Sequence, residues 1–181
     1  MSKKILVFGA SSSKNSINKQ FASFVAGQLT KVELVPLDLN DFELPLYSID
    51  LERKIGIPKN AKQFSQHIQN CDAIVASFAE HNGLFTTAFK NLWDWMSRLD
   101  SSKIWHNKPI FLLSASVSKR PQNYVTKVAK ELFPHYGGEI IASFYLPSYH
   151  YYFKDGQIVE TSLEAAFQAQ LHLFQQFLTN Q

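Results

Sequence analysis

Apolar residues follow two patterns along the chain: short continuous runs, and longer segments in which they recur every three or four positions. Continuous runs suit strands that are buried on both faces of a parallel sheet, and the longer period suits amphipathic helices. The runs predict strands at residues 5–8, 32–35, 73–78, 109–114 and 140–146. The periodic segments predict helices at residues 17–29, 58–70, 86–99, 123–133 and 162–178.

Polar residues, prolines and glycines mark the expected boundaries of these elements. Ser16 is expected to cap the first helix, because its side chain can accept a hydrogen bond from a free N–H group at the helix start. Pro36 is expected to stop the second strand, and Pro134 to end the helix before it. Residues 37–57 have no sustained period and predict a long loop, and long loops in compact domains are often functional.

Strands that alternate with helices predict an α/β fold, in which helices cover both faces of a parallel sheet. No repeat, low-complexity tract or interdomain linker interrupts this order. A protein domain typically has roughly 150 residues. We therefore expect residues 1–181 to form a single domain.

Composition excludes several classes of protein. Hydrophobic residues make up 45% and charged residues 18%, which is the opposite of the balance in disordered chains. The net charge of +3 is spread without runs and does not indicate nucleic-acid binding. A single cysteine, Cys71, excludes a disulfide framework, and the six histidines lack metal-ligand spacing. The apolar runs are too short for a membrane span, and the start predicts a strand rather than a signal peptide, so we expect a cytoplasmic protein.

Ligands of open α/β sheets lie beyond the carboxyl ends of the strands. The first segment in such a position, residues 9–18, combines four serine hydroxyls, Lys14 and a fresh helix N-terminus. Free N–H groups and the helix dipole favour an anion there. The alternative is that Ser16 only caps the helix and the other serines are solvated. The dinucleotide motif G-x-G-x-x-G and the P-loop are both absent.

Two more polar segments follow predicted strands. Residues 78–83 contain Asn82 and Gly83 after a Glu-His pair, and they can line a ligand or form an ordinary turn. Residues 114–118 are small enough to bring backbone N–H groups close to a ligand, or they form a generic loop. Ser116 does not suit a hydrolase nucleophile, because the G-x-S-x-G motif is missing.

Together the three segments resemble the NAD(P)H-dependent FMN reductases of the flavodoxin-like superfamily, which also include quinone and azo-dye reductases. The family motif G-S-x-R-x-x-S-x-N aligns with residues 10–18. The motifs P-E-Y-N and K-N-x-x-D-W align with residues 79–82 and 90–95. The chain departs from these motifs at four positions: Ala10 replaces Gly, Ser13 replaces Arg, Ala79 replaces Pro and His81 replaces Tyr.

The resemblance implies a flavodoxin-like three-layer sandwich, with a five-stranded parallel sheet and helices on both faces. It implies an enzyme that transfers hydride from NADPH or NADH to FMN and on to a flavin, quinone or azo acceptor, with no catalytic side chain and no metal. The implied FMN-binding residues are Ser11, Ser13, Lys14, Ser16, Ile17, Asn18, Ala79, Glu80, His81, Asn82, Gly83, Ser114, Ala115 and Ser116.

Two other functions stay open on the sequence. One is a flavin-free nicotinamide enzyme in which Asp38 holds a ribose, although the missing glycines argue against it. The other is a flavodoxin-like electron carrier or binding module without catalysis, although such carriers tend to be strongly acidic. Lys14, Lys119 and Arg120, near the expected cleft, predict a modest preference for NADPH over NADH.

The helix at residues 86–99 has apolar residues on more than one face. Trp93 and Trp95 are two positions apart and point in different directions, so one is expected to face outward. Exposed apolar patches usually mark interfaces, which predicts a homodimer or homotetramer with the cofactor near the boundary. The aromatic residues 149–153 are expected to add to that surface or to cover the flavin. The alternative is that residues 37–57 bury both tryptophans.

Overall fold

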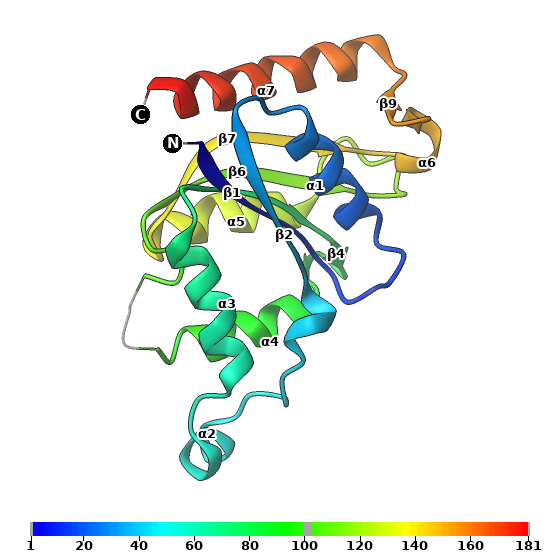
Figure 1. The fold of residues 1–181 in the computed structure, drawn as a ribbon. Helices are drawn as coiled ribbons and strands as arrows, with labels where there is room; N and C mark the ends of the chain where they lie inside the picture. Colours follow the sequence, from blue (N-terminus) through cyan, green and yellow to red (C-terminus); the bar gives the residue numbers. More distant parts are fainter. Residues whose placement is uncertain (1, 100–102, 181) are drawn as a thin grey trace.

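A five-stranded parallel sheet forms the middle layer of the protein (Figure 1). The computed structural model describes residues 2–99 and 103–180. The strand order is β2-β1-β3-β6-β7, the 2-1-3-4-5 order of flavodoxin-like folds, so the predicted fold class is confirmed. These strands are β1 (Lys3–Ala10), β2 (Val32–Asp38), β3 (Ala73–Phe78), β6 (Lys108–Ala115) and β7 (Gly138–Leu146).

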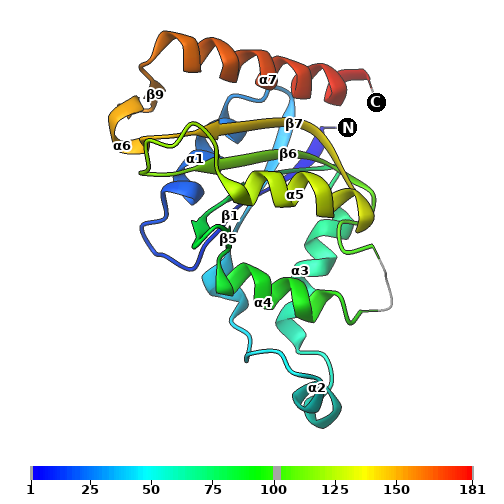
Figure 2. The same ribbon diagram turned by 180° about the vertical axis from the view of Figure 1, so that it is seen from behind.

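Helices cover both faces of the sheet (Figures 1 and 2). Alternate residues of β1 explain this, because Ile5 and Val7 belong to one apolar cluster, and Leu6 and Phe8 belong to the other. The first cluster is closed by α1 (Ile17–Gly27) and α7 (Thr161–Asn180), and the second by α3 (Lys59–Asn70), α4 (Thr87–Met96) and α5 (Tyr124–His135).

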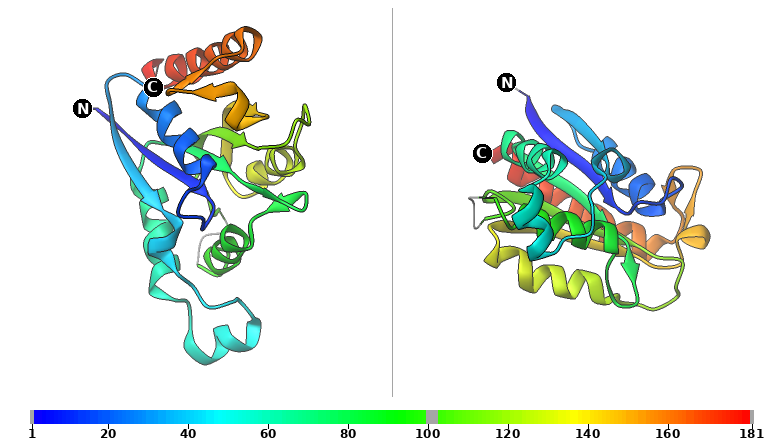
Figure 3. Two further views of the ribbon diagram at one scale, coloured as in Figure 1. Left: turned by 90° about the vertical axis from the view of Figure 1, so that its right-hand side faces the viewer. Right: turned by 90° about the horizontal axis from the view of Figure 1, so that it is seen from below.

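Residues 37–57 are more ordered than a long loop. They contain the 3₁₀ turn η1 (Leu39–Phe42) and the helix α2 (Ile49–Ile55), which projects away from the sheet (Figures 1 and 3). Between these elements the segment packs on α4, where Trp95 Nε1 donates a hydrogen bond to the carbonyl of Pro45 at 2.8 Å. The segment therefore covers α4.

The prediction that a tryptophan of this helix faces outward is wrong. Trp95 is fully buried beneath Pro45, and Trp93 is only 7% exposed among the aromatic rings of the second cluster. Residues 37–57 bury Trp95, and Phe133 and Tyr136 pack on Trp93. The apolar character of α4 thus reflects burial within the chain.

Two proline positions also differ from expectation. β2 continues through Pro36 to Asp38, because β2 is an edge strand and an edge tolerates the missing N–H group. Pro134 lies inside the last turn of α5 and does not stop it earlier.

Besides η1 and α2, four short strands and one short helix lie outside the predicted elements: β4 (Glu80–His81), β5 (Leu84–Phe85), α6 (Tyr149–Tyr152), β8 (Phe153–Lys154) and β9 (Gln157–Ile158). Within residues 2–99 and 103–180, no helix is both long and apolar enough to cross a membrane.

Candidate functional site

Three polar loops follow β1, β3 and β6, which are neighbours in the sheet. All three strands are parallel, so their carboxyl ends meet at one edge and the loops lie next to one another there. We call residues 11–16 the serine loop, residues 79–83 the hairpin loop and residues 114–118 the third loop. This edge is where open α/β sheets bind their ligands.

The serine loop leads directly into α1. Ser16 Oγ accepts a hydrogen bond from the N–H of Lys19 at 3.2 Å, which is the predicted helix cap. Ser11 is buried, and its Oγ accepts a hydrogen bond from the N–H of Ser13 at 3.2 Å. Lys14 is exposed, as are the side chains of its neighbours on both sides. Since the first N–H groups of a helix have no partner within it, the loop presents donors and a cation together.

Gly9 allows α1 to start this close to the sheet. A Cβ atom at this position would lie 2.4 Å from the backbone N of Lys19 and 2.6 Å from its Cα. These are backbone atoms and cannot move aside, so any other residue would push the helix away from β1. The glycine therefore sets where the N-terminus of α1 lies.

The side chain of Asn18 binds the protein itself. Its Oδ1 accepts hydrogen bonds from Ala115 N at 2.8 Å and Ser77 Oγ at 2.7 Å, and its Nδ2 donates to Ala115 O at 3.0 Å. Asn18 thus ties the start of α1 to the ends of β3 and β6. These bonds occupy Oδ1 of Asn18 and both backbone groups of Ala115, and the backbone N–H of Asn18, in the first turn of α1, has no partner within the helix.

The hairpin loop is a two-residue β-hairpin. Asn82 has φ 53° and Gly83 has φ 86°, as both central residues of a type I′ turn require. The Glu80 side chain, 5% exposed, accepts hydrogen bonds from Arg120 Nη2 at 2.9 Å and from the N–H of Tyr124 at 2.5 Å. Glu80 therefore fastens the hairpin to the start of α5, where the helix dipole favours a carboxylate.

The remaining residues of the hairpin loop stay available. His81 and Asn82 are exposed, while Ala79 and Gly83 are partly buried. Glu80, which the resemblance implies is an FMN-binding residue, fixes the loop through these hydrogen bonds. Its partner Arg120 also donates from Nε to Ser118 Oγ at 3.3 Å, so the guanidinium is held against the two loops although the side chain is 53% exposed.

Most polar groups of the third loop form hydrogen bonds within the protein. Ser114 Oγ donates to Phe78 O at 2.7 Å and accepts from Asn123 Nδ2 at 2.5 Å. The N–H of Ser116 donates to Leu146 O, and its Oγ accepts from the N–H of Ser118. Among the N–H groups of residues 115–118 in the described structure, that of Val117 has no hydrogen-bond partner.

A fourth polar group at this edge is the carboxylate of Asp38, at the end of β2. It forms an ion pair with Lys19 and accepts hydrogen bonds from the backbone N and Nδ2 of Asn40, at 3.0 and 2.8 Å. The hydrogen bond from Lys19 holds the pKa of Asp38 below its usual range. The carboxylate is thus already partnered, which leaves it poorly placed to hold a ribose.

Sequence reasoning located the three loops but missed the partners that hold them. Ser77, Asn123 and Leu146 lie inside predicted elements or at their ends, and no local signal marks them as anchors. The Asn18–Ala115 contact spans 97 positions of the chain. Contacts of this range depend on the sheet order, which the alternation of strands and helices does not specify.

Comparison with known proteins agrees with this architecture. Residues 3–152 match the family model of NADPH-dependent FMN reductases. An uncharacterized protein of Mycoplasma pneumoniae is 36% identical over 98 residues, 54% of this chain and 57% of the relative. A quinone reductase of Escherichia coli is 28% identical over 101 residues, 54% of this chain and 53% of the relative. The chain thus spans about half the length of the curated relatives it matches.

Two solved structures share the fold. FerB, a flavoenzyme NAD(P)H:(acceptor) oxidoreductase from Paracoccus denitrificans, superposes with a TM-score of 0.69 at 21% identity, covering 96% of this chain and 98% of FerB. An azoreductase from Bacillus anthracis superposes with a TM-score of 0.66 at 15% identity, covering 98% of this chain and all of the azoreductase (100%). With the family match across most of its length, the chain belongs to the NADPH-dependent FMN reductase family.

Proposed function

We propose that residues 1–181 form one FMN-binding domain that acts as an NAD(P)H-dependent oxidoreductase. It takes hydride from NADPH or NADH and passes electrons to a flavin, quinone or azo acceptor. The observation that carries this proposal is the serine loop, which opens α1 at the same sheet edge as two further polar loops. Family membership supports the flavin, and the relatives named quinone reductase and azoreductase support the acceptor classes.

The donors of the serine loop suit the phosphate of FMN. Ser11 and Ser16 each accept a hydrogen bond through Oγ, which leaves their O–H protons free to donate to a phosphate. The N–H groups of Ile17 and Asn18 open the helix and point toward the same anion. Lys14 supplies the positive charge, since the family arginine is replaced by serine at position 13. A lysine is a point charge without the bidentate fork of arginine.

The hairpin loop and the third loop are proposed to flank the isoalloxazine ring. Residues 79–83 would lie along one edge and residues 114–116 along another. Of these, Glu80, Ser114 and Ala115 act by fixing the loops, since their polar groups already have partners. The free N–H of Val117 can stabilise negative charge on the pyrimidine side of the ring, as an oxyanion hole does.

The protein's share of the reaction is positioning and electrostatics. The bound flavin supplies the chemistry of hydride acceptance and electron donation. No side chain of the three loops is assigned a proton transfer or a covalent bond. The loops instead hold the reactants in line, and the Asn18 and Glu80 contacts keep the loops rigid, which is worth several orders of magnitude in rate when the geometry is correct.

Two alternatives have less support. A flavin-free nicotinamide enzyme would need Asp38 for a ribose, and Lys19 and Asn40 already occupy that carboxylate. A non-catalytic electron carrier would favour a strongly acidic surface, whereas the net charge is +3. Neither alternative accounts for the match to a reductase family.

We also propose that the protein is a homodimer. The support is a groove between α4, α5 and the segment near residue 46, where large apolar side chains face outward. Leu46 is 74% exposed and Leu84 57% exposed, and Leu132 lies beside them. Leu84 begins β5, directly after the hairpin loop, so a subunit packed here would border the flavin. A cytoplasmic location is proposed from the one thiol, Cys71, which is free and buried.

The experiment that tests the proposed function is flavin binding followed by turnover. Purified protein titrated with FMN should quench flavin fluorescence and oxidise NADPH when a quinone is added. Riboflavin, which lacks the phosphate, should bind much more weakly. Equal affinity for FMN and riboflavin would remove the phosphate assignment, and NADPH oxidation without flavin would favour the flavin-free alternative.

A further inference from the structure

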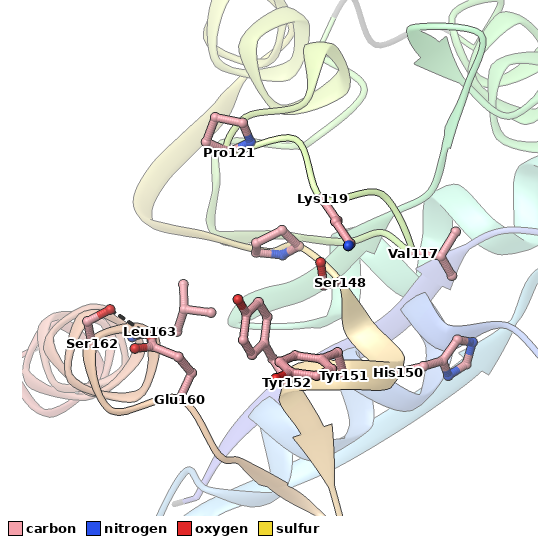
Figure 4. Close-up of a pocket in the computed structure, with 11 residues that line it drawn as sticks. Val117, Lys119, Pro121, Ser148, His150, Tyr151, Tyr152, Glu160, Ser162 and Leu163 are labelled. Carbon is pink, nitrogen blue, oxygen red and sulfur yellow. Dashed lines mark hydrogen bonds between the residues drawn. The ribbon is translucent and has the colours of Figure 1, made fainter.

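A groove of about 800 Å³ lies beside the third loop (Figure 4). Val117 and Lys119 line it from that loop and its continuation, and His150, Tyr151 and Tyr152 line it from α6. A cavity of this size can hold a nucleotide-sized ligand. None of the family motifs includes these residues. The groove borders the proposed flavin site, because Val117 belongs to both.

Backbone hydrogen bonds fix the two walls of the groove to each other. Ser148 N donates to Ser118 O at 2.8 Å, and Tyr149 N donates to Ser116 O at 2.9 Å. The wall formed by α6 is therefore anchored on the third loop, where we propose that the flavin ring lies. The groove therefore adjoins the proposed position of the ring, since Val117 of the third loop lines it.

The charge of the groove is uneven. Lys119 is exposed, and its ammonium has no ion-pair or hydrogen-bond partner among the described residues. The neighbouring Arg120 is paired with Glu80 and is not among the residues that line the groove. His150 is a second basic side chain on the wall.

The acidic side chain of the groove is Glu160. Its carboxylate accepts hydrogen bonds from Ser162 Oγ and from the N–H of Leu163, both at 2.7 Å, which hold it against the start of α7. Figure 4 shows Glu160 on the opposite side of the groove from Val117 and His150. An anion in the groove is thus repelled from one end and attracted toward Lys119.

We propose that this groove binds the adenosine 2′-phosphate end of NADPH, with Lys119 contacting the phosphate and the exposed ring of Tyr151 packing on adenine. The inference rests on the proposed function, since it extends the hydride donor away from the flavin. Aromatic side chains pack on flat rings, and a lysine ammonium pairs with a phosphate as a point charge. NADH lacks the phosphate, so Lys119 would determine which nucleotide is preferred.

The test measures the dissociation constants of NADPH and NADH by stopped-flow reduction of the FMN-loaded protein. Lys119→Ala should weaken the binding of NADPH about fivefold and leave the binding of NADH unchanged. Fivefold corresponds to the loss of an exposed ion pair of about 1 kcal/mol. Lys119→Arg should restore NADPH binding. The matched control is Lys154→Ala, which removes the same charge from β8, an exposed position that does not line the groove.

A second measurement needs no turnover. Calorimetry should show that adenosine 2′,5′-bisphosphate binds the FMN-loaded protein more tightly than adenosine 5′-phosphate, and that Lys119→Ala removes the difference. Tyr151→Ala should weaken both ligands, whereas Lys119→Ala weakens one. This binding does not depend on reduction of the flavin. If the protein binds the bisphosphate through Lys119 but does not reduce FMN, the proposed function is wrong and the inference about the groove still holds.

Two results would overturn the inference. One is an unchanged ratio of NADPH to NADH affinity in Lys119→Ala, with the bisphosphate binding as before. The other is a Lys119→Ala effect confined to the KM of an anionic acceptor such as anthraquinone-2-sulfonate, which would assign the groove to the second substrate.

Discussion

Asn18 and Ala115 hold each other through two hydrogen bonds, because the amide of Asn18 accepts from the N–H of Ala115 and donates to its carbonyl. This pair fastens the start of α1 to the end of β6. The serine loop and the third loop, proposed to bind opposite ends of FMN, therefore keep a fixed separation. A rigid cofactor benefits from a site whose two halves are already spaced for it.

Replacing Asn18 by leucine should lower the free energy of unfolding. The change leaves the N–H and carbonyl of Ala115 buried without partners, at a cost of about 1–3 kcal/mol for each unsatisfied group. Urea unfolding measures the loss. Asn60→Ala is the control, because its one side-chain hydrogen bond, to Glu43 O, is exposed and should matter little. Equal stability of Asn18→Leu and the parent would show that the contact is not structural.

Ser13→Arg should tighten FMN binding. This change restores the arginine of the family motif at an exposed position, where its fork can bind the phosphate through two hydrogen bonds. We expect an increase of about fivefold or more in FMN affinity and no change for riboflavin. Fluorescence titration with both ligands decides this, with Lys62→Arg, on the surface of α3, as the control. A parallel gain for riboflavin would mean that the new side chain does not touch the phosphate.

The free energy of unfolding should fall at alkaline pH because the thiol of Cys71 is buried. Burial raises the pKa of its thiol to about 11, from about 9 in the unfolded chain. Below pH 9 both states hold the proton, so the contribution is fully present. Between pH 9 and 11 only the unfolded chain loses the proton, and stability falls by about 1.4 kcal/mol per pH unit.

The check is the difference in unfolding free energy between the parent and Cys71→Ala from pH 8 to 11. This difference removes the titration of lysines and tyrosines, which both proteins share. It should be constant below pH 9 and shrink above it. A constant difference throughout the range, or rapid labelling of the native thiol by a disulfide reagent at pH 8, would contradict a buried protonated Cys71.

Leu84→Asp should dissociate the proposed dimer. A charge placed in an apolar interface loses its hydration, so the subunits should separate at concentrations where the parent stays associated. Light scattering after gel filtration gives the mass. Val159→Asp is the matched control, because Val159 is 55% exposed but lies away from the groove of α4 and α5. A parent with the mass of one chain at every concentration would remove the dimer.

Sequence pattern alone predicted the five strands of the main sheet, the helices α1, α3, α4, α5 and α7, and the three loops at the sheet edge. Buried strands such as β3 read as continuous apolar runs, and Ser16 capped α1 as expected. Local chemistry decides such features, so a local pattern reveals them. An ordinary turn at Asn82 and Gly83 was one of two interpretations of residues 78–83, because an Asn-Gly pair favours a turn by itself.

The use of each polar side chain was less predictable. Asn18, Glu80 and Ser114 were expected at the cofactor, and their side chains also form hydrogen bonds with backbone or side-chain groups far along the chain. A short polar side chain in a loop suits both roles equally. Only the neighbours that folding provides decide between them. The burial of Trp95 under Pro45 has the same origin.

Pro36 has a consequence for how copies of the protein can meet. It interrupts the row of N–H donors along the outer side of β2, the exposed margin of the sheet. A second chain cannot add a continuous strand there, which removes a common route to aggregation and to fibrillar stacking. Copies of the protein therefore cannot associate by pairing backbones at β2. Any association between them uses side-chain surfaces elsewhere.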